Sequence, residues 1–213
     1  MKDSSLQGLT TVIQSQATFD LIDLFSPHVT FEKMPPQRRL YYFVDGERIC
    51  YIIRSGVIKV RRDVDEFVMA SLPTPNLTGM TNMLPDDTGL FLEMQTEAEI
   101  AIITTAEAHQ IIAEADAWEL LAGHIAKVSA NLLKNNIIMT APTTYEVVRF
   151  QLVMLLSEPE SIRNSVTAAK YILERTRLSR STVMKILAQL KQGGYIQLDD
   201  GFLTAVNHLP AKY

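Results

Sequence analysis

The sequence is poor in cysteine and lacks long apolar runs, and each absence excludes a class of protein. Cys50 is the only cysteine in 213 residues, so one chain forms no internal disulfide, four-cysteine zinc site or four-thiolate iron–sulfur cluster. The longest apolar stretches, such as Ile100–Ile103, are far shorter than the about 18 residues of a membrane span. The first residues also lack the apolar stretch of a secretory signal. We expect a cytoplasmic protein without a membrane partner.

Motifs of the common enzyme classes are missing as well. The sequence has no glycine-rich phosphate loop, no HExxH, no GxSxG and no carboxylate pair placed for acid–base chemistry. We therefore expect a protein that is not an enzyme and has no cofactor. The histidines do not have the spacing of zinc or haem ligands, so we expect no metal site among His28, His109, His124 and His208.

Cysteine and methionine leave two interpretations open. Cys50 lies in Arg48–Ile53, which is typical of a buried strand, where cysteine is usually a small apolar filler; a redox role is the alternative. The methionines are expected to fill the interior of the same region, and the alternative is that they line an apolar ligand pocket: Met69, Met80, Met83 and Met94.

Positive charge is scarce over most of the chain and concentrated near its end. Residues 1–163 contain 13 Lys/Arg and 21 Asp/Glu, a net charge of −8, whereas residues 164–213 contain 7 and 3, a net charge of +4. A basic segment on an acidic protein is suited to contact with nucleic-acid phosphates.

Short β-branched and aromatic runs separated by turn residues dominate the first half of the chain. Their density predicts a small antiparallel barrel or sandwich rather than a βαβ fold. A weak helical signal precedes them at residues 8–26. The expected strands are His28–Phe31, Leu40–Val44, Ile49–Arg54, Val57–Arg61, Phe67–Leu72, Leu90–Met94 and Ala98–Thr104.

A long helix is predicted next, over residues 106–140. Apolar residues recur along it at intervals of three and four, which is the seam of a coiled coil. Dimerisation through this seam is the favoured interpretation, and docking of the helix onto the β domain is the alternative. Pro142 then marks a hinge. The predicted dimer interface comprises Trp118, Leu121, Ile125, Val128, Leu132, Asn135 and Met139.

The last third predicts a helix at 144–157, a polar loop at 158–164, two short helices and a hairpin. Ser179 is placed to cap the second short helix, and Gly201 lies in the turn of the hairpin. A plain helical hairpin with a solvated basic face is the alternative to a DNA-reading pair. The short turn, the concentrated charge and the hairpin favour DNA binding by Arg175, Arg177, Ser179, Arg180, Ser181, Thr182, Met184 and Lys185.

In the order of its elements, the chain resembles the CRP/FNR superfamily of bacterial transcriptional regulators over about residues 28–206. Ile49–Val60 is similar to a hairpin of the family's β-roll. Leu178–Leu187 is similar to its recognition helix, with Arg180 and Lys185 at DNA-facing basic positions. Arg175–Ser181 and the last seven residues are similar to IprA-type regulators, which are linked to control of hydrogen peroxide resistance.

The resemblance also bears on ligands. The family's cyclic-nucleotide pocket uses a glutamate for the ribose and an arginine for the phosphate. Gly79 is retained here, but Met80 and Thr88 stand at those two positions. Because a buried phosphate would lack its charged partner, we expect no cyclic-nucleotide binding.

The resulting prediction is an α+β chain with three parts. Residues 1–105 form N-terminal helical turns and a β-roll of the cyclic-nucleotide-binding type, a double-stranded β-helix. Residues 106–140 form the long dimerisation helix and 141–213 the winged helix-turn-helix. The expected partners are duplex DNA with a palindromic site, a second copy of the chain and RNA polymerase. The alternative function is a β-roll ligand-binding or protein-interaction module with a relic DNA-binding domain.

Overall fold

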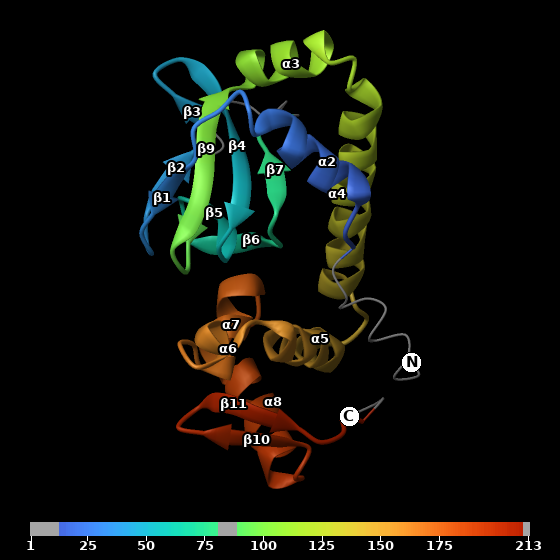
Figure 1. Ribbon diagram of the computed structural model, residues 1–213. Coiled ribbons are helices and arrows are strands. Elements are labelled where there is room, and N and C mark those ends of the chain that lie inside the picture. The colour runs from blue at the N-terminus through green and yellow to red at the C-terminus, as the bar shows by residue number, and fades with distance from the viewer. Residues whose placement is uncertain (1–12, 81–88, 211–213) are drawn as a thin grey trace. The chain divides into compact units, whose positions relative to one another are not determined.

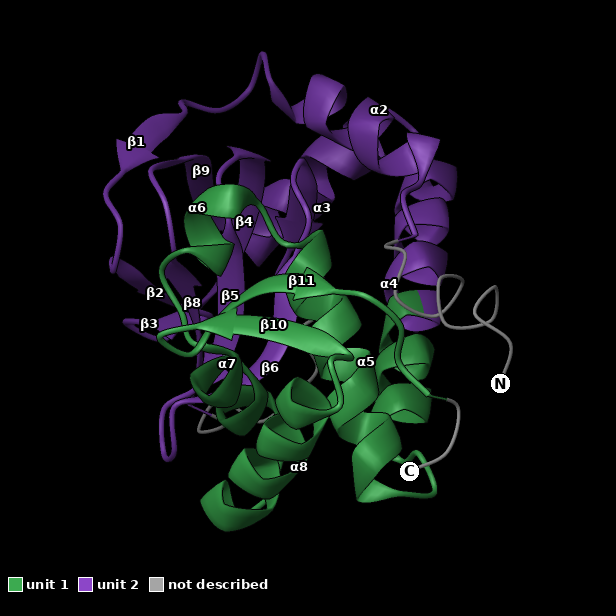
Figure 2. Cartoon of the chain, turned by 90° about the horizontal axis from the view of Figure 1, so that it is seen from below, with its two compact units in different colours: residues 1–12, 131–213 green, residues 13–130 purple. Residues whose placement is uncertain are grey.

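The computed structural model describes residues 13–80 and 89–210 and divides the chain into two compact units (Figure 2). The first, the β unit, comprises residues 13–130. The second, the C-terminal unit, is described over residues 131–210. The division falls within helix α4 (Trp118–Met139).

The β unit contains two antiparallel sheets (Figure 1). One has the order β1-β9-β4-β3, with β7 also pairing with β4, and the other has the order β2-β8-β5-β6. The strands are β1 (Glu32–Met34), β2 (Arg39–Tyr41), β3 (Phe43–Val44), β4 (Glu47–Ser55), β5 (Ile58–Arg62), β6 (Phe67–Leu72), β7 (Asn76–Thr78), β8 (Leu90–Met94) and β9 (Ala98–Thr104).

Strand β4 is buried on both faces, which explains its continuous apolar run. Side chains alternate between the two faces of a strand. Tyr51 and Ile53 join a core shared with residues of the second sheet, whereas Cys50 and Ile52 join a core shared with the helices. The prediction that Cys50 lies in a buried strand is confirmed.

Three helices complete the β unit: α2 (Gln16–Phe25), α3 (Thr105–Glu114) and the first part of α4. A capping box fixes the start of α3, since the Thr104 hydroxyl accepts from the Glu107 backbone N–H and the Glu107 carboxylate accepts from the Thr104 backbone N–H. Asp116 has φ of 50°, a left-handed conformation that interrupts the helix between α3 and α4. The predicted single helix over 106–140 is therefore wrong.

Three details of the strand prediction also differ from the structure. The expected strand Leu40–Val44 is divided into β2 and β3, which belong to different sheets. The first strand is β1, which lies just after the expected His28–Phe31 and pairs with β9. Strand β7 was not expected, because only three residues follow Pro75 before Gly79.

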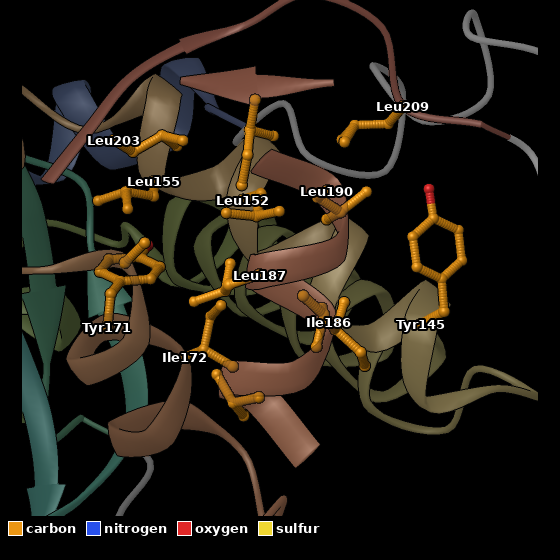
Figure 3. Close-up of a cluster of buried hydrophobic side chains, with 14 of the residues drawn as sticks. Tyr145, Leu152, Leu155, Tyr171, Ile172, Ile186, Leu187, Leu190, Leu203 and Leu209 are labelled. Carbon is orange, nitrogen blue, oxygen red and sulfur yellow. The ribbon is translucent and has the colours of Figure 1, made fainter. Parts of the chain in front are cut away.

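Three helices and a two-stranded sheet contribute side chains to the main apolar core of the C-terminal unit (Figure 3). Leu152, Ile172 and Leu187 bring three different helices into this core. The polar segment predicted as a loop contains the short helix α6. The elements are α5 (Thr144–Ser157), α6 (Glu160–Arg163), α7 (Ala168–Arg175), α8 (Arg180–Gln192), β10 (Ile196–Asp199) and β11 (Phe202–Val206).

Candidate nucleic-acid interface

Helices α7 and α8 are joined by a turn of four residues, and each begins at a hydroxyl cap. The Thr167 side chain accepts a hydrogen bond from the Lys170 backbone N–H, and the Ser179 side chain accepts one from the Thr182 backbone N–H. These caps satisfy backbone donors that have no partner within the helix. The predicted cap of the second helix is confirmed.

Helix α8 has one buried face and one exposed face. Its apolar residues Val183, Ile186, Leu187 and Leu190 are buried in the core of the unit. The buried positions repeat at the helical period, so the intervening residues lie on the opposite side. The exposed residues of this side are Arg180, Ser181, Met184, Lys185, Ala188 and Gln189.

The exposed face is positively charged and carries hydroxyl groups at its N-terminal end. Helix α8 contains no Asp or Glu, and no ion pair of Arg180 or Lys185 is found among the described residues. The Ser179 Oγ lies 2.9 Å from the Ser181 Oγ and 2.8 Å from the Thr182 Oγ1. Cationic and hydroxyl groups at a helix N-terminus are donors suited to phosphate oxygens and base edges.

Arg175 differs from the prediction. Its side chain is 5% exposed, and its Nη2 lies 3.7 Å from the Glu158 carboxylate. The guanidinium carbon lies 3.6 Å from the centre of the Tyr171 ring, and the Tyr171 hydroxyl donates to Glu158 at 2.9 Å. Arg175 is thus buried by its own unit and is unavailable to DNA, and its predicted role in DNA contact is wrong. Arg177, in the turn, is exposed.

The wing follows α8 as predicted. Strands β10 and β11 pair antiparallel, and Asp200 and Gly201 between them both have positive φ, 45° and 86°. Two consecutive positive φ angles are typical of the type I′ turn of tight hairpins. The Ala168 backbone N–H donates to the Gly201 carbonyl at 2.9 Å. The wing turn is therefore tied to the start of α7, a contact that the sequence pattern did not reveal.

Two of the three residues at the positions of the family's nucleotide pocket, Gly79 and Met80, are described by the structure. Gly79 has φ of +93°, and a Cβ there would lie 2.2 Å from the Ile49 carbonyl oxygen, so the close approach of the chain to β4 requires glycine. Met80 is buried among apolar residues that include Cys50 and Leu77. Thr88 lies outside the described residues.

The predicted seam of α4 is divided between two environments. Leu121 is buried in the core of the β unit, and Ile125 packs against that core. Val128, Asn135 and Met139 are half-buried. Trp118 and Leu132 are exposed. Two further exposed apolar residues, Leu133 and Ile137, lie outside the predicted seam.

Sequence comparisons place this geometry in a family. Residues 144–211 match a model described as winged helix-turn-helix DNA binding. The chain is 30% identical over 176 residues to the inhibitor of hydrogen peroxide resistance of Escherichia coli K12, covering 76% of this chain and 79% of that protein. The protein of the same name from Salmonella typhimurium is 25% identical over 195 residues, covering 82% of this chain and 89% of that protein.

The chain belongs to the family of the inhibitor of hydrogen peroxide resistance. The resemblance to IprA-type regulators inferred from the sequence is confirmed.

Solved structures support the family's fold across both units. The global regulator CLP of Xanthomonas campestris, described as responsive to c-di-GMP, aligns with a TM-score of 0.69 at 16% identity, covering 90% of this chain and 100% of that chain. A putative transcriptional regulator of the CRP/FNR family from Eubacterium rectale aligns with a TM-score of 0.64 at 14% identity, covering 88% and 90%. The predicted fold class, an N-terminal β-roll, helices and a C-terminal winged helix-turn-helix, is confirmed.

The described residues contain neither a candidate membrane span nor a metal-binding cluster. Across residues 13–80 and 89–210, no helix has the length and hydropathy that a bilayer span requires. Within the same ranges, His, Cys, Asp and Glu form no group of three or more that could hold a metal ion.

Proposed function

We propose that the chain is a homodimeric transcriptional regulator that reads a palindromic duplex site with α8. The observation that carries the proposal is the exposed, acid-free face of α8, which presents Arg180 and Lys185 next to a wing. Arg180 lies in the first turn, where it can pair bidentately with the N7 and O6 atoms of guanine. Lys185 can reach a base edge or a phosphate. Ser179, Ser181, Thr182 and Arg177 complete the proposed contact surface.

The names of the relatives indicate which genes the chain controls. The relatives are named for inhibition of hydrogen peroxide resistance, so the genes controlled by this chain are proposed to include peroxide-stress genes. A regulator of this kind acts in the cytoplasm and alters transcription through RNA polymerase.

Cyclic nucleotides are not part of the proposed mechanism. Met80 contributes to an apolar core and supplies no acceptor for a ribose hydroxyl, which a buried sugar would require. We expect no saturable heat of binding when cyclic AMP is titrated into the protein at micromolar concentrations.

The dimer is proposed to form through α4. The exposed side of this helix bears small residues in its first half and larger apolar residues in its second half, spaced for contact with a second helix. This side is displaced by about one residue from the seam expected from the sequence. Its members are Ala122, Ala126, Ser129, Leu132, Leu133 and Ile137.

Duplex binding measured at several salt concentrations tests the proposal. Genomic fragments are first selected with the wild-type chain, and the affinity of the selected duplex is then measured. The Arg180→Ala variant is expected to lose about 5- to 150-fold in affinity at each half-site, which corresponds to about 1–3 kcal/mol for each bidentate base contact. If Lys185 of each subunit neutralises a phosphate, Lys185→Ala reduces the steepness of log K against log salt by about 1.8, because the dimer then neutralises two fewer phosphate charges.

Lys33→Ala is the matched control, because Lys33 is an exposed lysine of the β unit and its loss makes the same change in net charge. The proposal is wrong if the wild-type chain binds no duplex in a salt-sensitive manner, or if the Arg180→Ala plus Lys185→Ala double variant binds like the control.

A further inference from the structure

One apolar side chain in the middle of the basic face of α8 has no role in the fold of its unit. Met184 is 48% exposed. Among the described residues 144–210 it is the one large hydrophobic side chain that is exposed, and it is absent from the apolar residues that pack against the core there. Burial therefore does not explain a methionine at this position.

The neighbours of Met184 define what it can meet. Arg180 lies one turn before it and Ala188 one turn after it, so the three share a face of the helix. Lys185 is adjacent, and all of these residues are exposed. A partner that covers this face of α8 has to present negative charge to the basic residues and an apolar group to Met184.

The major groove offers one apolar group among its base edges, the 5-methyl of thymine. Methionine is unbranched and polarizable, so it can fill the space around a methyl group without exact shape complementarity. We propose that Met184 is a specificity-determining residue that contacts the 5-methyl group of a thymine in each half-site, beside the guanine read by Arg180. This inference rests on the proposed function and adds the identity of a second base.

Replacement of thymine by deoxyuridine provides a direct test, because it removes the methyl group and leaves the base pair unchanged. In the selected duplex, each thymine is replaced in turn. At one position in each half-site, the replacement is expected to lower the affinity of the duplex for the wild-type chain about fourfold. This is the effect of removing one buried methyl-sized group. Symmetric replacement in both half-sites is expected to lose about 15-fold.

Variants of Met184 identify the side chain responsible. Met184→Ala is expected to bind the thymine and deoxyuridine duplexes equally, and Met184→Leu is expected to retain part of the difference. Met184→Gln is expected to change the selected base from thymine to adenine, because Gln pairs with the N6 and N7 atoms of adenine. Met69→Ala, which removes an exposed methionine of β6, is the matched control and is expected to behave like the wild type.

The outcomes separate this inference from the proposed function. Salt-sensitive binding that depends on Arg180, combined with no deoxyuridine-sensitive position, overturns the role of Met184 alone. A deoxyuridine effect that persists in Met184→Ala also overturns it. Failure of the wild-type chain to bind any duplex overturns both. Because Met184 is outside the core, the denaturation midpoint of Met184→Ala is expected to equal that of the wild type.

Discussion

Burial makes a basic side chain costly to charge, and the β unit contains two buried basic side chains next to each other. His124 and Lys127, one turn apart on α4, are both buried. The His124 Nδ1 lies 3.0 Å from the Thr18 Oγ1, and the Lys127 Nζ donates to the Thr18 Oγ1 and to the Asn76 Oδ1, each at 3.3 Å. Burial, with Lys127 as a second cause, lowers the pKa of His124 to about 4 from its ordinary 6.5. Burial also lowers the pKa of Lys127.

The lowered pKa of His124 predicts a loss of stability in acid. The unfolded chain takes up a proton below about pH 6.5, whereas the folded chain resists it until about pH 4. Stability is therefore fully present above 6.5 and is lost as the pH falls toward 4, by up to about 3 kcal/mol. Urea unfolding at pH 7.5 and 5 measures this loss. His124→Gln is expected to show a flatter dependence on pH.

His28→Gln is the control for this experiment, because His28 is exposed and its replacement is expected to leave the wild-type dependence on pH. An equally steep acid loss in His124→Gln would contradict the assignment to His124.

Cys50 is expected to be chemically inert in the folded protein. The side chain is fully buried, and burial raises the pKa of its thiol well above the ordinary value. Since the thiolate is the reactive form, neither oxidants nor disulfide reagents find a nucleophile here. Ellman's reagent is expected to react with the native protein only at the rate of unfolding, and rapidly in concentrated guanidinium chloride. Rapid, stoichiometric labelling of native protein would restore the redox interpretation of Cys50.

At the scale of elements, the start of α8 depends on one hydroxyl. Ser179→Ala removes the acceptor of the Thr182 backbone N–H and is expected to cost about 1 kcal/mol in the free energy of unfolding. Denaturant unfolding measures the change. Ser181→Ala removes a hydroxyl from the same group without removing the cap, and it is expected to cost less than half as much. Equal losses in the two variants would show that the cap is not the stabilising contact.

Elements with strong periodicity or clear end signals were predictable from the sequence. Strands β6, β8 and β9 have the expected bounds, because each is a short apolar run between polar or turn residues. Helix α5 also has the expected bounds. The break before α4 was missed, although the apolar spacing begins only at Trp118 and Asp116 is of a residue type that adopts positive φ more readily than most. Similarly, β7 is too short for its alternation to be recognised.

The sequence predicted which face of α8 is exposed, but it did not predict which single side chains are buried by other parts of the chain. The apolar spacing of α8 identified its buried face, and the remaining residues of the helix form the exposed face. Charge counting placed Arg175 with the other basic residues, because the sequence does not show that Glu158 and Tyr171 enclose it in the folded unit. The heptad spacing of α4 likewise marked apolar positions without distinguishing residues buried within the chain, such as Leu121, from those left exposed.

At the scale of the whole molecule, the charge suits contact with DNA and the exposed apolar residues suit contact with a second copy of the chain. The negative charge lies in residues 1–163 and the positive charge in residues 164–213, so nonspecific attraction to DNA is confined to the segment that contains α8. The exposed side of α4, by contrast, has few charges. The proposed palindromic site would be read by two copies of α8, and affinity for it would require that the chains be joined.

Dissociation of the dimer is therefore expected to weaken DNA binding without altering α8. Leu133 is 61% exposed on α4, and Leu133→Asp would place two carboxylates in an apolar helix contact, where they are neither solvated nor paired. Sedimentation is expected to show a monomer, and affinity for the full palindrome is expected to fall at least ~100-fold, whereas affinity for an isolated half-site stays unchanged. Val64→Asp, at an exposed apolar residue of the β unit, is the matched control and should remain dimeric. A dimeric Leu133→Asp plus Ile137→Asp double variant would place the dimer contact elsewhere on the chain.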